Sequence, residues 1–123
     1  MAGILPNQAF PDQLPWVDMS DLLVNGWSVT GLTQYVIAKA DGNDAKLNGS
    51  LVIGGEGRTA LTISLGYRPQ TTQNIMGFIT GHGPTTLQLQ RGGVLLIPTY
   101  AWPGDQVIGQ VITFAHTYPR KAN

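Results

Sequence analysis

Apolar and polar residues alternate along several short stretches of the chain. Leu47, Leu51 and Ile53 fall in one phase, and Leu87 and Leu89 do so further on, with mostly polar residues between them. A period of two turns successive side chains to opposite faces of a strand, so each stretch predicts a strand with one buried face. The stretches that alternate in this way are residues 46–53, 59–65 and 85–90.

Turn-forming residues separate these stretches from further apolar runs. Ala40-Asp41-Gly42-Asn43 supplies the Asp-Gly and Gly-Asn pairs that tolerate the positive φ of hairpin turns. The other apolar runs are residues 34–39, 74–80, 94–97 and 106–116. About eight short strands at spacings near ten residues, with no helical stripe, predict an all-β antiparallel β-sandwich of the jelly-roll type.

Prolines set the first residues apart. Pro6, Pro11 and Pro15 fix extended backbone and remove ladder donors, so residues 1–15 are predicted to be an arm or linker. This arm is expected either to be a disordered terminus or to pack on a neighbouring subunit or a larger particle. We expect one sandwich domain over residues 16–118 and a short tail at residues 119–123.

Charged residues are scarce: seven are basic and seven acidic, or 11% of the chain, against about a quarter in a typical domain. A neutral chain lacks the basic field that nucleic acid or an anionic membrane requires. Residues 94–97 and 106–116 are apolar on both faces, and such strands need cover on both sides. Low charge and doubly apolar strands predict association with copies of the chain, or cover by an arm or loop. No signal peptide and no run of about 18 apolar residues is seen, so membrane insertion is not expected.

Several phrases occur in a fixed order along the chain. They are Trp16-Val17-Asp18, Asn25-Gly26-Trp27-Ser28, Leu47-Asn48-Gly49-Ser50-Leu51-Val52-Ile53-Gly54-Gly55 and Leu65-Gly66-Tyr67-Arg68-Pro69. This order resembles the C-terminal knob modules of phage tail fibres and minor tail proteins, in which a strand ending in two glycines precedes a short strand that closes on Gly-Tyr-Arg-Pro. The likeness runs from Trp16 to Phe114. The sequence departs from the family pattern at Ser64-Leu65, where the family usually has a proline before the Gly-Tyr.

The resemblance implies a virion protein of a tail or head fibre, made in the host cytoplasm. It also implies a β-sandwich, a homotrimer, contact of the arm with other virion proteins and attachment to a host surface, commonly through a glycan. The Gly-Tyr-Arg-Pro phrase is expected to be structural. Gly66 permits a kink, Tyr67 fills a sandwich end, Arg68 offers donors at a subunit contact, and Pro69 fixes the departing backbone.

Candidate catalytic groups are few. His82 lies in a glycine-proline turn and His116 on the last strand, and no nucleophile-elbow phrase occurs. The acidic residues lie mostly in turns and suggest no facing carboxylate pair of a glycosidase. The chain has no cysteine for a metal site, and Asp41-Gly42-Asn43-Asp44 lacks the spacing of a calcium loop. We therefore expect no enzyme, no cofactor and no metal.

The best ligand-binding candidates lie in residues 99–105. Tyr100 and Trp102 offer flat faces on which sugar rings can stack, and Asp105 can accept hydrogen bonds from sugar hydroxyls. His82, in a separate turn, is a further candidate. The alternative is that Tyr100 and Trp102 plug the end of the sandwich or a seam between subunits.

Three functions stay open at this point. The first is a trimeric receptor-binding knob, and the second is a purely architectural head or tail decoration protein without a receptor. The third is a lectin-like β-domain outside any virus. The first two share a fold and an assembly, and they differ only in whether a ligand is bound.

Overall fold

The computed structural model describes residues 13–121, which form eight antiparallel strands and four short 3-10 turns. The strands are β1 (Gln13–Asp18), β2 (Tyr35–Asp41), β3 (Asp44–Val52), β4 (Thr59–Thr62), β5 (Gln73–Ile79), β6 (Gly83–Leu89), β7 (Val94–Leu96) and β8 (Val111–Pro119). The 3-10 turns are η2 (Ser20–Leu22), η3 (Leu65–Tyr67), η4 (Thr99–Ala101) and η5 (Asp105–Val107). The prediction of an all-β protein with about eight strands is confirmed.

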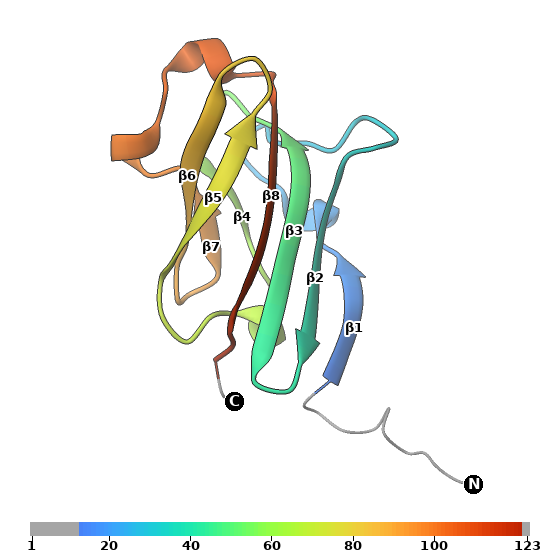
Figure 1. The fold of residues 1–123 in the computed structure, drawn as a ribbon. Coiled ribbons are helices and arrows are strands. Elements are labelled where there is room, and N and C mark those ends of the chain that lie inside the picture. Colours follow the sequence, from blue (N-terminus) through green and yellow to red (C-terminus); the bar gives the residue numbers. More distant parts are fainter. Residues whose placement is uncertain (1–12, 122–123) are drawn as a thin grey trace, which may run out of the picture.

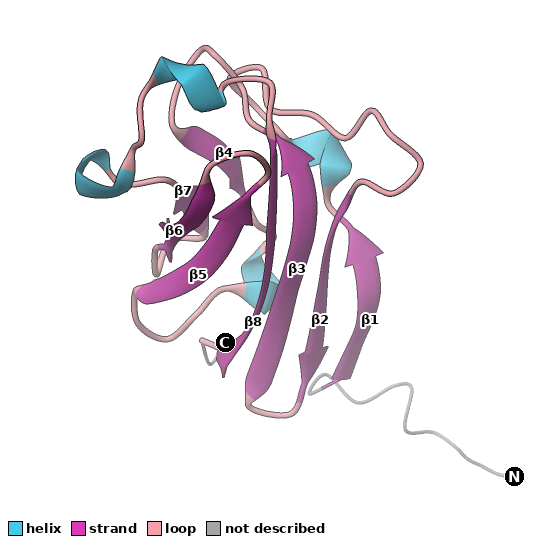
Figure 2. Cartoon of the chain, turned by 45° about the horizontal axis from the view of Figure 1, so that its top comes forward, coloured by secondary structure: helices cyan, strands magenta, loops and turns pink. Residues whose placement is uncertain are grey.

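All eight strands join one curled sheet in the order β1-β2-β3-β8-β5-β6-β7-β4 (Figure 1). The last strand, β8, lies in the middle and pairs with β3 on one side and β5 on the other. Strands β5, β6 and β7 follow one another, and β4 returns beside β7, which is a Greek-key arrangement. The sheet curls, so its β1-β2-β3-β8 half and its β5-β6-β7-β4 half form the two walls around the core (Figure 2).

The predicted strand phases agree with the observed burial. Leu47, Leu51, Leu87 and Leu89 all turn inward and are fully buried. Within residues 13–121 the buried set holds no charged residue, and no buried polar side-chain atom lacks a hydrogen-bond partner. The core is therefore apolar, as the alternation predicted.

The last strand differs most from its predicted range. It was expected over residues 106–116, but β8 begins at Val111 and runs to Pro119. Gly104 and Gly109 have φ values of 117° and 87°, a backbone conformation that favours glycine, and they bracket η5, so the chain turns before it enters the sheet. At the other end of the chain, β1 begins at Gln13, within the segment predicted to be an arm.

Phe114 lies at the seam between the two halves of the sheet. It pairs with Gly49 of β3 on one side and with Gly77 of β5 on the other. A Cβ added to Gly49 would come within 2.5 Å of the Phe114 ring, and one added to Gly77 would come within 2.6 Å of Leu87. Both glycines therefore leave room for the core side chains of the seam, of which the Phe114 ring is the largest.

The Gly66-Tyr67-Arg68-Pro69 phrase lies beside the second half of β8, between Phe114 and the end of the strand. Strands β5 and β8 stop pairing at Gly77, and from there β8 continues alone along β3. An antiparallel bridge between Pro69 and Arg120 joins the phrase to the end of β8. The phrase thus occupies the edge of β8 that β5 leaves open.

Side-chain hydrogen bonds fix this closure. The buried Tyr118 hydroxyl donates to the Tyr67 carbonyl at 2.6 Å, and the Tyr67 hydroxyl donates to the Pro15 carbonyl at 3.2 Å. Arg68 Nε donates to the Ile63 carbonyl at 3.0 Å. These contacts lie within one chain, so a role of Arg68 at a subunit contact stays a prediction.

The two ends of the sheet differ in what they carry. β1 begins and β8 ends at the end that holds the β2–β3 hairpin, because Gln13 pairs with Asp41, and Pro119 pairs with Asp44. The opposite end carries the β5–β6 turn and the loops before β4 and β8 (Figure 1). This loop end is therefore opposite the start of β1 and the end of β8.

The Gly49–Phe114 contact gives a first prediction. Gly49→Ala should destabilise the fold by about 1–3 kcal/mol, because the added methyl overlaps the ring. Adding Phe114→Leu should make the double variant more stable than the sum of the two single changes predicts. Urea unfolding measures these free energies; additive effects would contradict the contact. Gly92→Ala, where a Cβ meets nothing within 4 Å, is the control.

A second prediction concerns alkaline pH. Burial raises the pKa of the Tyr118 hydroxyl well above its ordinary value near 10. The neutral hydroxyl is therefore favoured in the folded state, and its stabilisation is full below about pH 10 and is lost as the pH rises further. Tyr118→Phe should cost about 1–3 kcal/mol at neutral pH, because the Tyr67 carbonyl loses its buried donor.

The same variant should also lose less additional stability than the wild type between neutral and alkaline pH. Burial raises the pKa of Tyr67 as well, so part of the alkaline dependence should remain. Thermal unfolding across this pH range is the measurement, with the exposed Tyr100→Phe as the control. An alkaline dependence identical to that of the wild type would contradict the assignment to Tyr118.

Candidate functional site

The four residues predicted to bind a ligand all lie in loops at the loop end of the sheet. Tyr100 is part of η4, Asp105 begins η5, and Trp102 lies between these turns. His82 is in the β5–β6 turn, which reaches this end because β5 finishes beside the start of β8.

Of these four residues, Trp102 and Asp105 share a cleft. Tyr100 is 74% exposed, His82 is exposed as well, and neither lines the cleft. The cleft has a volume of about 160 Å³, below the roughly 300 Å³ of enclosed small-molecule sites, so a ligand would lie across it. Its lining residues are Gly54, Gly55, Gly57, Arg58, Trp102, Asp105 and Ile108.

One wall of the cleft is residues 54–58, held against the turn at residues 25–27. The buried Trp27 donates from its indole Nε1 to the Gly57 carbonyl at 2.9 Å, and the Glu56 amide donates to the Asn25 carbonyl at 3.1 Å. A Cβ on Gly54 would overlap backbone atoms of this turn, so the approach requires glycine. Trp27 is therefore a packing residue that fixes the wall.

The other wall is residues 102–110, which are tied to the end of β3. The Ile53 amide donates to the Gln110 carbonyl at 2.9 Å, and the Gly109 amide donates to the Ile53 carbonyl at 2.9 Å. Trp102 is half-buried and packs against the core. Because backbone hydrogen bonds hold both walls, little ordering is needed when a ligand binds.

Arg58, Trp102 and Asp105 give the cleft its chemistry. In the part of the chain that the structure describes, neither the Arg58 guanidinium nor the Asp105 carboxylate is engaged by a hydrogen bond or ion pair with the protein. The guanidinium offers five donors and the carboxylate accepts hydrogen bonds, while the indole supplies an aromatic surface. A hydroxyl-rich ring such as a saccharide matches this combination.

Arg58 was not among the residues predicted from the sequence. It lies far from residues 99–105 along the chain, and the pairing of Thr59 with Leu96 brings the two segments to one end. The available signal was a charged residue directly after Gly54-Gly55-Glu56-Gly57 in a chain with few charges. That signal did not indicate which other residues would lie near Arg58, because strands β4 and β7 are far apart in the sequence.

The outer face of β5 and β8 is a second feature of the surface. Met76 is 72% exposed and Phe78 is 55% exposed, and Phe78 pairs with Thr113 of β8. Ala115, two residues further along β8, is exposed as well. We call Met76, Phe78 and Ala115 the apolar strip. Exposed apolar surface of this kind marks interaction sites when it is contiguous.

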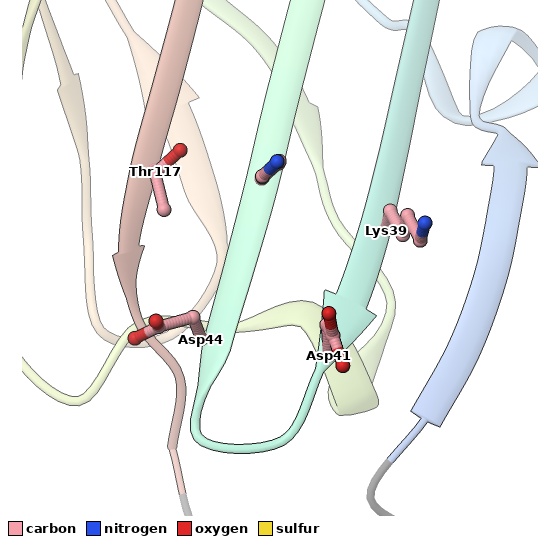
Figure 3. A pocket seen from close by; sticks show the side chains of 5 residues that line it. Lys39, Asp41, Asp44 and Thr117 are labelled. Atoms are coloured by element: carbon pink, nitrogen blue, oxygen red, sulfur yellow. The ribbon is translucent and has the colours of Figure 1, made fainter.

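A second depression lies on the outer face of β2, β3 and β8, toward the β2–β3 hairpin (Figure 3). Its volume is about 250 Å³. The residues that line it are Lys39, Asp41, Asp44, Lys46 and Thr117.

The second histidine is half-buried on β8. His116 Nε2 lies 3.2 Å from Gln73 Oε1, and the ring stacks on Tyr118 with centroids 6.1 Å apart. Burial lowers the pKa of His116, which favours the neutral ring. Among residues 13–121, no group of three or more His, Cys, Asp or Glu side chains is arranged to hold a metal ion. None of the helical turns in this range is long and apolar enough to cross a bilayer.

No protein-family model matches the chain, and a search of curated proteins finds no matching protein. The resemblance to phage fibre knobs therefore rests on the phrases of this sequence alone.

Proposed function

We propose that this chain is a virion attachment protein, a trimeric phage fibre knob that binds a host-surface glycan in the cleft of Arg58, Trp102 and Asp105. The observation that carries the proposal is this cleft, which is lined by an aromatic side chain and by a guanidinium and a carboxylate that have no partner among residues 13–121. Saccharides need such a combination, because they present hydroxyl groups at the edge of the ring and C–H groups on its face. The proposed activity is binding and not catalysis.

The position of the cleft supports attachment. Gln13 and Pro119 lie at the opposite end of the sheet, beside the β2–β3 hairpin. A knob joined to other virion proteins through its N-terminal side would therefore turn its loop end outward. Residues 1–12, which include most of the predicted arm, lie outside the described residues.

The apolar strip supports assembly. Met76 and Phe78 project from a central strand of the sheet, and no charged residue belongs to the strip. A trimer that buries the strip of each copy against its neighbours would cover these side chains and leave the cleft free. The chain's low charge fits such an assembly, because little repulsion opposes association.

A decoration protein without a receptor is the second candidate. The apolar strip favours it as much as it favours the knob, because the strip supports assembly whether or not a ligand is bound. The same cleft on a monomer would suit a lectin-like domain outside any virus. Ligand binding and oligomeric state therefore separate the three functions.

Substitutions in the cleft test ligand binding. Asp105→Asn and Arg58→Gln should each weaken binding to an array of bacterial surface glycans by about tenfold, because each removes a charge-assisted hydrogen bond. Trp102→Ala should abolish binding, with loss of the stacking surface as the cause. Thermal unfolding of each variant separates this loss from misfolding, because Trp102 also packs on the core.

The matched control for this experiment is Asp21→Asn, an exposed aspartate on η2 outside the cleft. It should bind as the wild type does. No glycan bound by the wild type would overturn the attachment role and favour the decoration protein.

Substitutions in the apolar strip test assembly. Phe78→Arg should convert the trimer into monomers, because a desolvated arginine without a partner would be buried at the interface. Light scattering coupled to size exclusion at micromolar concentration measures the mass. Leu65→Lys, which alters a 61% exposed side chain on η3, should leave the trimer intact. A monomeric wild type, or a Phe78→Arg variant that stays trimeric, would contradict this interface.

A further inference from the structure

The depression on β2, β3 and β8 is built around a row of three polar side chains. The strand register sets Lys39 of β2 directly opposite Lys46 of β3, and Lys46 directly opposite Thr117 of β8. All three line the same depression on the outer face, where Figure 3 labels Lys39 and Thr117. We call them the lysine row. Two lysines and a threonine, all hydrogen-bond donors, thus occupy adjacent positions on three neighbouring strands, and the Lys39 side chain leans toward Trp16 of β1.

Like charges at opposite positions of a sheet oppose each other. Directly paired residues hold their Cβ atoms about 5 Å apart, and like charges there are destabilising. Within residues 13–121, no hydrogen bond or ion pair engages Lys46 with any other residue of the chain. Lys39 lies over the ring of Trp16, with its Nζ 5.9 Å from the ring centroid. An anion placed between the two ammonium groups would remove their repulsion.

The surroundings of the row favour an anion that also carries hydroxyl groups. Asp41 and Asp44 are opposite each other one step nearer the hairpin and line the same depression. Carboxylates repel a simple anion, but they accept hydrogen bonds from hydroxyls. On the other side of Lys39, the Trp16 ring is 43% exposed and offers an aromatic edge to the row.

We propose that the lysine row binds the carboxylate of an acidic saccharide, while Asp44 accepts hydrogen bonds from its hydroxyls. The choice of a saccharide rests on the proposed attachment function, whereas the oxyanion chemistry rests on the row itself. This site is separate from the cleft of Arg58, Trp102 and Asp105, which lies at the loop end. One copy of the chain would then contact a surface polysaccharide at two places.

Trigalacturonate and its fully methyl-esterified form are the probes, because esterification removes the charge and keeps the rings. In amide NMR spectra, trigalacturonate should shift the signals of Lys39, Lys46 and Thr117 in a saturable way. The ester should leave them in place. Lys39→Gln and Lys46→Gln should each weaken trigalacturonate binding by about fivefold, the size expected for an exposed ionic contact.

Two matched variants control for charge. Arg91→Gln removes the same charge from the exposed β6–β7 turn and should bind as the wild type does. Asp44→Asn removes a negative charge but should still weaken binding, because the charge-assisted hydrogen bond from a ligand hydroxyl becomes a neutral one. Tighter binding by this variant would show that net charge and not the proposed contact governs binding. Equal weakening by Arg91→Gln would overturn the site, because it would show a general effect of net charge.

Other outcomes would also overturn the proposal. Absence of saturable shifts at the row, or equal binding of the methyl ester, would remove the oxyanion site. If inorganic phosphate bound the row as tightly as trigalacturonate, the assignment to a saccharide would be wrong. If trigalacturonate does not bind the row but glycans bind in a way that requires Trp102, this site is rejected and the attachment function through the cleft is kept. If trigalacturonate binds the row but no glycan binds the cleft, the attachment function through the cleft is rejected and this site is kept.

Discussion

The insertion of β8 between β3 and β5 is the constraint on which the rest of the structure depends. Without this strand, the two halves of the sheet share no backbone pairing, and the core between them has no closed wall. The strand fits because Gly49 leaves room for the Phe114 ring, and Gly77, which pairs with Phe114 on the other side, leaves room for Leu87 and Ile112. Since β8 is the last strand along the chain, this pairing joins segments that are far apart in sequence.

The same strand separates the two ends of the molecule. Where β5 leaves β8, the Gly-Tyr-Arg-Pro phrase takes its place, and Tyr118 and Tyr67 fasten that end through their hydroxyls. The cleft lies at the other end of the sheet, where β8 begins, and loops form it. Hydrogen bonds to Ile53 and from Trp27 hold these loops in place. Loops held by backbone hydrogen bonds, at the end of the sheet opposite Gln13 and Pro119, would suit the attachment function that we propose.

Local patterns predicted the strands well and their partners poorly. Alternation identified Leu47, Leu51, Leu87 and Leu89 as core residues, because a strand with one buried face leaves that signature in sequence. It did not identify β1, whose prolines suggested an arm, or the true start of β8, which two glycines with positive φ delay. Trp102 and Asp105 were predicted as site residues, but Arg58 and the lysine row were not. Arg58 is brought to the cleft by the pairing of β4 with β7, and the lysine row is formed by the pairing of β3 with β2 and β8. Alternation within one strand does not indicate which strand it pairs with or in which register.

Contact between the loop end and a surface saccharide can be followed by amide hydrogen exchange of the chain, with and without the saccharide that it binds best. We expect slower exchange at residues 54–58 and 102–110 when the saccharide is bound, with unchanged exchange at residues 66–70. Slower exchange confined to residues 66–70, or no change at either loop, would contradict it.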